Sequence, residues 1–235
     1  MPRAPSRTRR LWTTVRWPVG VAVTAFTYMW RITPIHRSER EGAWPDDGPP
    51  PVDAAVDSRG FQRPEDGSGP LFRRRYRARI AGAATPAAEL MQEIKRDPNR
   101  VAPGALAHFE KTAGGDGALR AGDEFLVRMP GPWDGPIRVV ETTPSSFRFA
   151  TLGGHLEAGQ IEWRASDDDG ALVFEIESWA RGGDRLSHLL HDRLPMAKEV
   201  QLHMWTSVLE RVARRAGGEL DGGIQVETVR VELHP

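Results

Sequence analysis

The chain of 235 residues contains no cysteine. It can therefore hold no disulfide framework, no thiolate-bound metal ion and no cysteine nucleophile. Apolar residues make up 39% of the sequence and charged residues 27%, a composition that supports a hydrophobic core and excludes general disorder. The sequence predicts a globular protein that folds without disulfide bonds.

Long hydrophobic runs are also missing. The most apolar stretch, residues 17–30, has 14 residues between Arg16 and Arg31. As a helix it would be about 21 Å long, shorter than the roughly 30 Å hydrocarbon core of a bilayer, so a full membrane span is disfavoured. Three interpretations stay open: a segment docked on the protein's own domain, an interfacial membrane anchor with tryptophans at its ends, and a cleaved secretory signal.

The net charge of zero conceals an asymmetry along the chain. Residues 1–40 carry eight arginines and one acid, whereas residues 41–68 carry seven acids and two arginines. A basic arm followed by an acidic, proline-rich stretch indicates an appendage that meets an anionic surface or folds back on the chain. We interpret residues 41–65 as a linker and place a domain boundary near residue 66. We expect a cytoplasmic protein that can reach a membrane surface through residues 1–40.

Residues 195–216 have the strongest helical pattern in the chain. Pro195 suits a first helical position, and Gly217 and Gly218 permit the left-handed conformation that ends many helices. The apolar positions recur at steps of three and four and form one broad face, which needs a partner to bury it. These positions are Ala197, Val200, Met204, Val208, Val212 and Ala216.

The segments before this helix alternate in the manner of strands. Residues 71–80 place four arginines on one side and apolar residues on the other; we interpret the arginines as a solvated face rather than a polyanion site. A helix is predicted from Thr85 to Lys95, a second short one over residues 104–111, and a third over residues 185–193. Five antiparallel strands and a late edge strand complete the prediction: residues 124–129, 137–143, 146–152, 160–165 and 172–179, and then 224–233.

This order of elements predicts an α+β fold in which a curved antiparallel sheet wraps around the long C-terminal helix. Both the sheet and the helix bury one face, and packing the two faces together is the economical solution. We assign residues 66–220 to this domain and residues 221–235 to an edge strand or tail.

Residues 151–162 and 173–181, together with the long helix, resemble an uncharacterised bacterial family, domain of unknown function 1990. This family is placed in the START-like superfamily of polyketide cyclases and lipid transport proteins. The resemblance covers about residues 66–220 and implies a helix-grip fold, with a cavity between sheet and helix for a hydrophobic molecule. Pro195 interrupts the helix where the family continues it, so the cavity mouth can differ.

His155 and Glu157 are the candidate polar site, two residues apart after a Gly-Gly turn. They could form a polar anchor in an apolar cavity or an acid–base pair. The alternative is a histidine that ties its own loop to the backbone. Aromatic residues are candidates for lining the ligand cavity, although aromatics at such spacing are more often plain core: Trp133, Phe149, Trp163 and Trp205.

Residues for chemistry beyond binding are scarce. His188 and His191 lie three residues apart, but no third metal ligand follows at a recognised spacing. We therefore assign no catalytic residue, metal or cofactor, and expect no nucleic-acid partner. The predicted function is non-catalytic binding of a hydrophobic small molecule or lipid by a carrier or sensor. The alternatives are a cyclase/aromatase-type enzyme that uses His155 and Glu157, and a membrane-associated interaction module.

Overall fold

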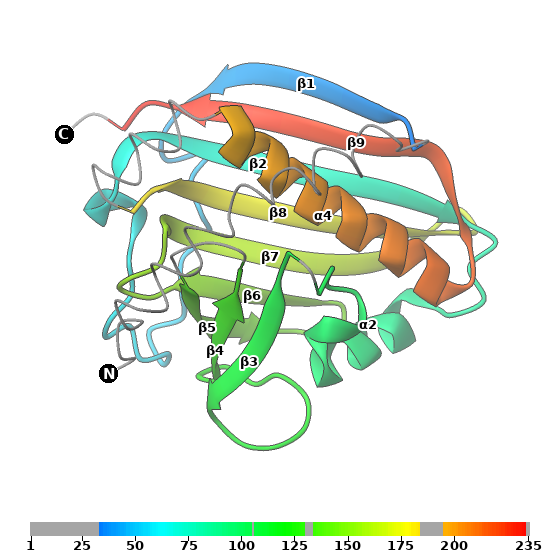
Figure 1. Cartoon of the computed structure of the whole chain (residues 1–235), viewed down its shortest axis with the longest axis horizontal. Helices are drawn as coiled ribbons and strands as arrows, with labels where there is room; N and C mark the ends of the chain where they lie inside the picture. The colour runs from blue at the N-terminus through cyan, green and yellow to red at the C-terminus, as the bar shows by residue number, and fades with distance from the viewer. Residues whose placement is uncertain (1–32, 105, 130–133, 184–194, 234–235) are drawn as a thin grey trace.

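In the part of the chain that the structure describes, two helices pack on one face of a single sheet (Figure 1). The structure, a computed structural model, describes residues 33–104, 106–129, 134–183 and 195–233, with side chains of the last range described from Gln201 onward. The helices are α2 (Ala87–Arg96) and α4 (Pro195–Ala216), and the short 3-10 turns are η1 (Pro64–Asp66) and η2 (Pro98–Arg100). The strands are β1 (Ile35–Gly42), β2 (Ser68–Ala81), β3 (His108–Ala113), β4 (Glu124–Arg128), β5 (Asp134–Thr142), β6 (Ser146–Thr151), β7 (Glu157–Asp168), β8 (Ala171–Gly182) and β9 (Glu219–Val231).

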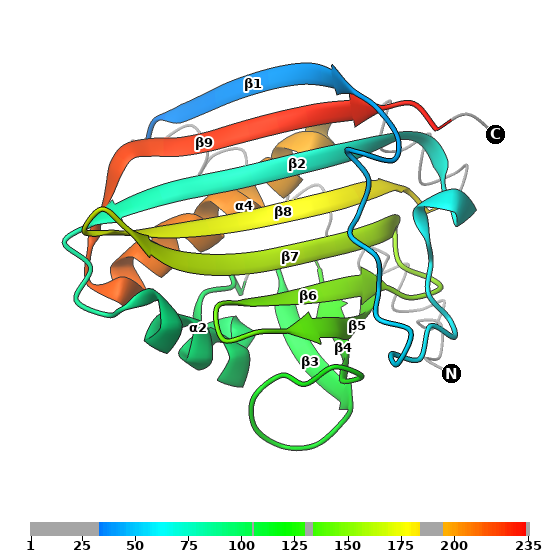
Figure 2. The ribbon, with the colours of Figure 1, turned by 180° about the vertical axis from the view of Figure 1, so that it is seen from behind.

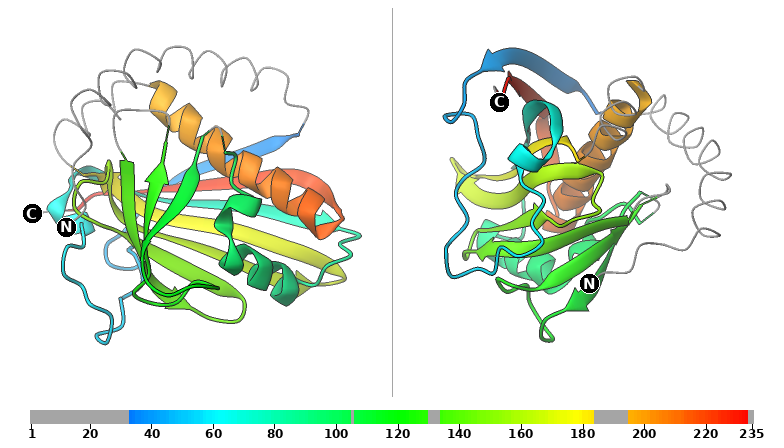
Figure 3. Two further views of the ribbon diagram at one scale, coloured as in Figure 1. Left: turned by 60° about the horizontal axis from the view of Figure 1, so that its bottom comes forward. Right: turned by 90° about the vertical axis from the view of Figure 1, so that its left-hand side faces the viewer.

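The sheet has nine strands in the order β1-β9-β2-β8-β7-β6-β5-β4-β3. Neighbouring strands are antiparallel except β1 and β9, which are parallel. The sheet curves around α4, which crosses its inner face diagonally (Figure 3). This arrangement confirms the predicted α+β helix-grip architecture.

The inner face and the two helices share one hydrophobic core. Val208, Leu209 and Val212 of α4 are buried against the sheet, as the periodicity of residues 195–216 predicts. Helix α2 buries Leu90 and Ile94 in the same core. Because both helices and all central strands contribute to this cluster, it holds the fold together.

The short helix predicted over residues 104–111 is wrong, because His108–Ala113 forms strand β3 and pairs with β4. Phe109 enters the core while the residues on either side of it are exposed, which is the alternation of an edge strand. The side chain of Asn99 accepts from the Phe109 N–H at 2.8 Å and donates to its carbonyl at 2.9 Å. These two hydrogen bonds hold the backbone of Phe109 in an extended conformation. The apolar pattern of this segment is too short to distinguish a helix from a strand.

Strand β9 is an inner strand rather than the predicted edge strand, since β1 pairs with its free side. Its mixed pattern has a physical cause. Ile224 and Val226 are buried in the core against α4, whereas Val229 and Val231 are buried on the outer face with Leu71 and Trp179. Strand β1 escaped prediction because its residues are mostly exposed and polar.

The arginine row of β2 lies on the outer face, as expected for a solvated surface. Each arginine has a carboxylate partner on a neighbouring segment, so the row is neutralised within the protein. The pairs are Arg73 with Asp47 and Glu177, Arg75 with Glu175 and Glu227, Arg77 with Asp168, and Arg79 with Asp168 and Asp221.

Residues 43–67, here named the strap, cross the outer face of the sheet (Figure 2). The carbonyl of Pro50 accepts from Gln160 at 3.2 Å and that of Pro51 accepts from Arg148 at 3.1 Å. The segment that the sequence suggested as a linker is therefore hydrogen-bonded to β6 and β7. The independence of residues 66–220 as a domain stays a prediction.

The basic arm lies almost wholly in residues 1–32, outside the described part of the chain. Its proposed contact with a membrane therefore stays a prediction. Among the described helices, none has the length and apolar character needed to cross a bilayer.

Asp47 anchors the start of the strap. Its Oδ1 atom accepts from Arg40 and Arg73, each at 2.9 Å, and its Oδ2 atom accepts from the Ala43 N–H at 3.2 Å. The hydrogen bond from Arg40 is the largest of the effects that lower the pKa of Asp47 from 3.8 to about 2. The carboxylate is thus stabilised in its charged form by the folded state.

We predict that Asp47→Asn lowers the free energy of unfolding at pH 7 by about 1–2 kcal/mol, because it removes charge-assisted hydrogen bonds. Since the folded-state pKa is lowered from 3.8 to about 2, this contribution is lost as pH falls through that range. Urea denaturation at pH 7 and pH 3 measures both effects, with the exposed neighbour Asp46→Asn as the control. Equal stability of wild type and Asp47→Asn at pH 7 would contradict the anchoring role.

Candidate functional site

An aromatic cluster fills the inner face between β6, β7 and α4. Phe149 of β6 is 1% exposed, Trp163 of β7 is 1% exposed and Trp205 of α4 is 9% exposed. The two tryptophan rings pack edge to face with centroids 5.9 Å apart. Phe147 links them to Phe149, with ring centroids at 5.4 Å from both Phe149 and Trp163. Three of the four predicted aromatic site residues thus meet; Trp133 lies outside the described residues.

The indole N–H groups of this cluster lack hydrogen-bond acceptors. Nε1 of Trp163 and Nε1 of Trp205 are both buried, and neither has a partner among the described residues. A buried donor without an acceptor costs about 1–3 kcal/mol. A carbonyl, carboxylate or hydroxyl oxygen of a bound molecule would relieve that cost at either nitrogen.

A polar chain lies beside the aromatic cluster and joins β2, α4 and β7. Arg74 of β2 donates to Oε1 of Gln201 at 2.8 Å. Nε2 of Gln201 donates in turn to the carboxylate of Glu157, at 3.1 and 3.3 Å from its two oxygens. Gln201 lies one helical turn before Trp205, so the polar chain and the cluster occupy the same face of α4.

Neither Arg74 nor Gln201 was predicted as a site residue, although the sequence contains a signal for Arg74. Four arginines of β2 alternate on the outer face, and Arg74 falls between them, in register with the apolar residues Tyr76 and Ala78. A charged residue within an apolar register is unusual, because burial of a charge is costly. Gln201 had no such signal, since a glutamine on a helix is ordinary.

His155 binds the backbone of its own loop. Its Nδ1 atom accepts from the Glu157 N–H at 2.9 Å and lies 3.0 Å from the Glu157 carbonyl oxygen. Burial lowers the pKa of His155, and the nearby Glu157 carboxylate and carbonyl only partly oppose this. Burial thus favours the neutral ring, and the contacts of Nδ1 tie the loop to its own backbone, which is one of the two alternatives given for His155.

The same loop is held from the strap by Gln62. Its Nε2 atom donates to the carbonyls of His155 and Glu157 at 3.1 and 3.3 Å, and its Oε1 atom accepts from the Gly154 N–H at 3.2 Å. The backbone around Glu157 is thereby fixed from the outer side of the sheet. This leaves the Glu157 carboxylate directed to Gln201 on the inner side.

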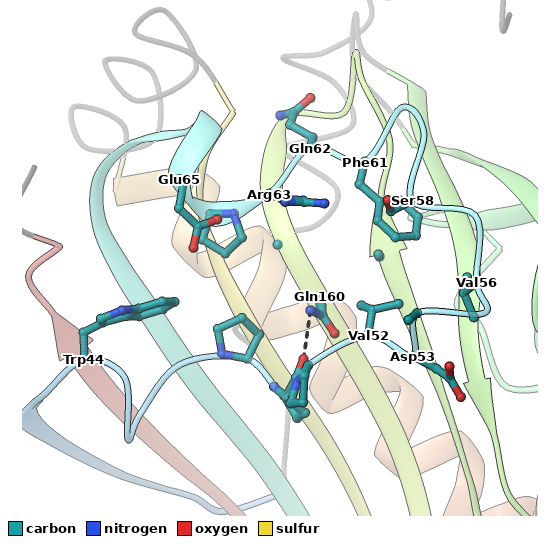
Figure 4. Close-up of a pocket in the computed structure, with 17 residues that line it drawn as sticks. Trp44, Val52, Asp53, Val56, Ser58, Phe61, Gln62, Arg63, Glu65 and Gln160 are labelled. Carbon is teal, nitrogen blue, oxygen red and sulfur yellow. Dashed lines mark hydrogen bonds between the residues drawn. The ribbon is translucent and has the colours of Figure 1, made fainter.

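A groove of about 450 Å³ lies between the strap and strands β6 and β7 (Figure 4). Trp44 and Phe61 lie toward its ends, and Gln160 lies in its floor with its amide bonded to the strap. The groove is on the outer face, opposite α4, and none of the predicted site residues that the structure describes lines it. Gln62 contributes to its wall, so one side chain contacts both the groove and the His155 loop.

Metal ligands do not gather in the described ranges, where no group of three His, Cys, Asp or Glu side chains is placed to hold an ion. His188 and His191, which the sequence analysis weighed as a metal pair, lie outside those ranges.

Residues 99–211 match the family described as "Domain of unknown function (DUF1990)". The match lies within the region that carries the resemblance in the sequence and confirms it. No curated protein matches the chain.

Several solved structures are similar in outline. Hypothetical protein jhp0584 from Helicobacter pylori is 10% identical with a TM-score of 0.45, and the match covers 60% of this chain and 86% of that one. Major latex-like protein 151 from Panax ginseng is 12% identical with a TM-score of 0.45, covering 63% and 99%. The di-domain ARO/CYC StfQ from the steffimycin biosynthetic pathway is 14% identical with a TM-score of 0.46, covering 66% and 53%. At these values the likeness carries no argument about function.

We predict that the His155 loop weakens on acidification. The pKa of His155 is lowered in the folded state, so below the ordinary value of about 6.5 the unfolded chain takes up a proton that the folded chain resists. The free energy of unfolding should therefore fall between pH 7 and pH 5, and less steeply in His155→Gln than in wild type. Urea denaturation of both proteins across this range checks it. If the free energy of unfolding had the same pH dependence in both proteins, the lowered pKa of His155 would not be its cause.

Proposed function

We propose that this protein binds one hydrophobic small molecule or lipid between the sheet and α4, as a carrier or sensor that leaves the ligand chemically unchanged. The observation that carries the proposal is the pair of buried indole N–H groups without acceptors, within an aromatic cluster beside a polar chain. The apolar part of such a ligand would pack on the aromatic cluster, and a polar oxygen of the ligand would accept a hydrogen bond from an indole N–H or from the polar chain. The helix-grip arrangement supports the same location, because the helix and the sheet contact each other through apolar side chains.

The contacts of the candidate pair favour binding over catalysis. Nδ1 of His155 is occupied by the backbone of Glu157, and the Glu157 carboxylate is occupied by Gln201. A general acid–base pair needs both groups directed at a substrate. Within the described residues, only Nε2 of His155 in this pair has no hydrogen-bond partner, and the Glu157 carboxylate is held by Gln201 rather than paired with that nitrogen. Action in the cytoplasm, with residues 1–40 bringing the carrier to a membrane surface, completes the proposal.

The first test is whether an apolar molecule binds at all. We expect the full-length protein, purified without detergent, to bind the neutral probe N-phenyl-1-naphthylamine with one-to-one stoichiometry and with energy transfer from tryptophan. Native mass spectrometry of the same sample should detect any apolar adduct that co-purifies. The absence of both probe binding and adduct would refute the proposal.

The location of the probe is tested with two truncations. Ile161 pairs with Phe149 on the inner face, and Val229 lies in the separate apolar cluster on the outer face. Ile161→Ala should weaken probe binding by about three- to tenfold, because apolar contacts with the ligand are lost. Val229→Ala removes similar bulk from the outer cluster and should leave the affinity unchanged. Equal losses in the two variants would exclude the inner face as the site.

A further inference from the structure

Arg74 is a buried charge on the inner face of the sheet. Its residue exposure is 7%, compared with side-chain exposures of 27% for Arg73 and 40% for Arg75, its neighbours on the outer face. The guanidinium lies over the ring of Phe72, 4.7 Å from the centroid, and is directed toward α4. Arg74 therefore occupies the region assigned to the ligand.

The charge of Arg74 is not neutralised by any carboxylate of the described residues. Its one hydrogen bond within that part of the chain goes to the neutral amide oxygen of Gln201. Arg73 and Arg75, on either side of it, each form two ion pairs. A buried guanidinium with a single neutral acceptor is costly, since burial of a charge normally requires a paired, hydrogen-bonded partner.

A buried hydroxyl without a hydrogen-bond partner among the described residues lies next to Arg74. Ser178 of β8 is its register partner, is 4% exposed, and its hydroxyl has no hydrogen-bond partner among the described residues. On one side of this pair the strands present Gly159 and Ala180, which carry little side-chain bulk. On the other side they present Ile176 and Trp163, which begin the aromatic cluster.

Gln201 bridges Arg74 and Glu157 through its amide group. Glu157 accepts from Nε2 of Gln201, which turns the amide so that its oxygen faces Arg74. The amide thus separates the carboxylate from the guanidinium. The remaining N–H groups of Arg74 and the Ser178 hydroxyl are left to an acceptor from outside the described chain.

We propose that Arg74 and Ser178 bind the anionic head group, a carboxylate or a phosphate, of an amphiphile whose apolar part lies on the aromatic cluster. This inference rests on the proposed function and narrows its ligand to an acidic lipid-like molecule. A planar guanidinium beside a hydroxyl matches the paired oxygens of such a group. The register places the head group and the apolar cluster two residues apart along the same strands.

The experiment compares ligands that differ only in the head group. Isothermal titration calorimetry of the full-length protein with dodecanoate, dodecyl phosphate and dodecan-1-ol, at concentrations below micelle formation, gives three affinities. We expect at least one of the two anions to bind about tenfold or more tightly than the alcohol, as a charge-assisted contact predicts. The tighter of the two anions identifies the head-group chemistry.

Two methionine variants test whether Arg74 is the residue that causes the preference for an anionic head group. Arg74→Met keeps the length of the side chain and should abolish the preference for the anion over dodecan-1-ol, because the charge that distinguishes the two head groups is removed. The matched control is Arg75→Met, one residue along on the outer face, which should retain the preference. Arg74→Lys keeps the charge without the planar fork and should retain part of it. If Arg74→Met does not fold, the affinities of Arg74→Lys for the anions and the alcohol provide the test instead.

The outcomes separate the two proposals. Equal affinity of wild type for anions and alcohol overturns the head-group assignment and leaves the proposed function standing. A preference that survives Arg74→Met, or that Arg75→Met also removes, overturns the assignment in the same way. Failure of all three amphiphiles and of N-phenyl-1-naphthylamine to bind refutes the proposed function, and the head-group assignment with it.

Discussion

Burial of one face of α4 against the inner face of the sheet is the contact on which the rest of the structure depends. The helix supplies Val208, Leu209 and Val212 to a core shared with the central strands and α2. Burial of each large aliphatic side chain contributes about 1.5–3 kcal/mol before conformational entropy is counted. The same packing brings Gln201 and Trp205 over β2 and β7, so the candidate site is positioned by the fold's main apolar interface.

The sequence predicted the parts of the fold with strong periodicity. The long helix, α2, β2 and the strands from β4 to β8 all have regular apolar spacing, and all are present. Strands β1 and β3 were not predicted, because β1 is mostly exposed and β3 is a short strand held by the side chain of Asn99. The edge assignment of β9 failed because a pattern within one strand does not reveal which strand pairs beside it.

The candidate site was predictable in its apolar part, whereas in its polar chain Glu157 was predicted and Arg74 and Gln201 were not. Phe149, Trp163 and Trp205 share a cluster, as aromatics in a core pattern suggest, and Glu157 points to the helix. Arg74 carried a signal in its register, but a contact between β2 and α4 spans 127 residues and follows from no local rule. The role of Gln62 was hidden for the same reason, since the strap reads locally as a linker.

The parallel pairing of β1 with β9 has a consequence for how the chain folds during synthesis. Each residue of β1 meets a partner about 190 positions later, as in the pair of Ile35 with Ile224. Strand β1, the first of the described strands to be synthesised, therefore waits until nearly all the described chain has been made. Until then the side of β2 that receives β9 is an open sheet edge, and open edges promote pairing with other chains. Most residues of β1 are charged or polar, so the waiting strand exposes little apolar surface, and the synthesis of β9 then completes the sheet.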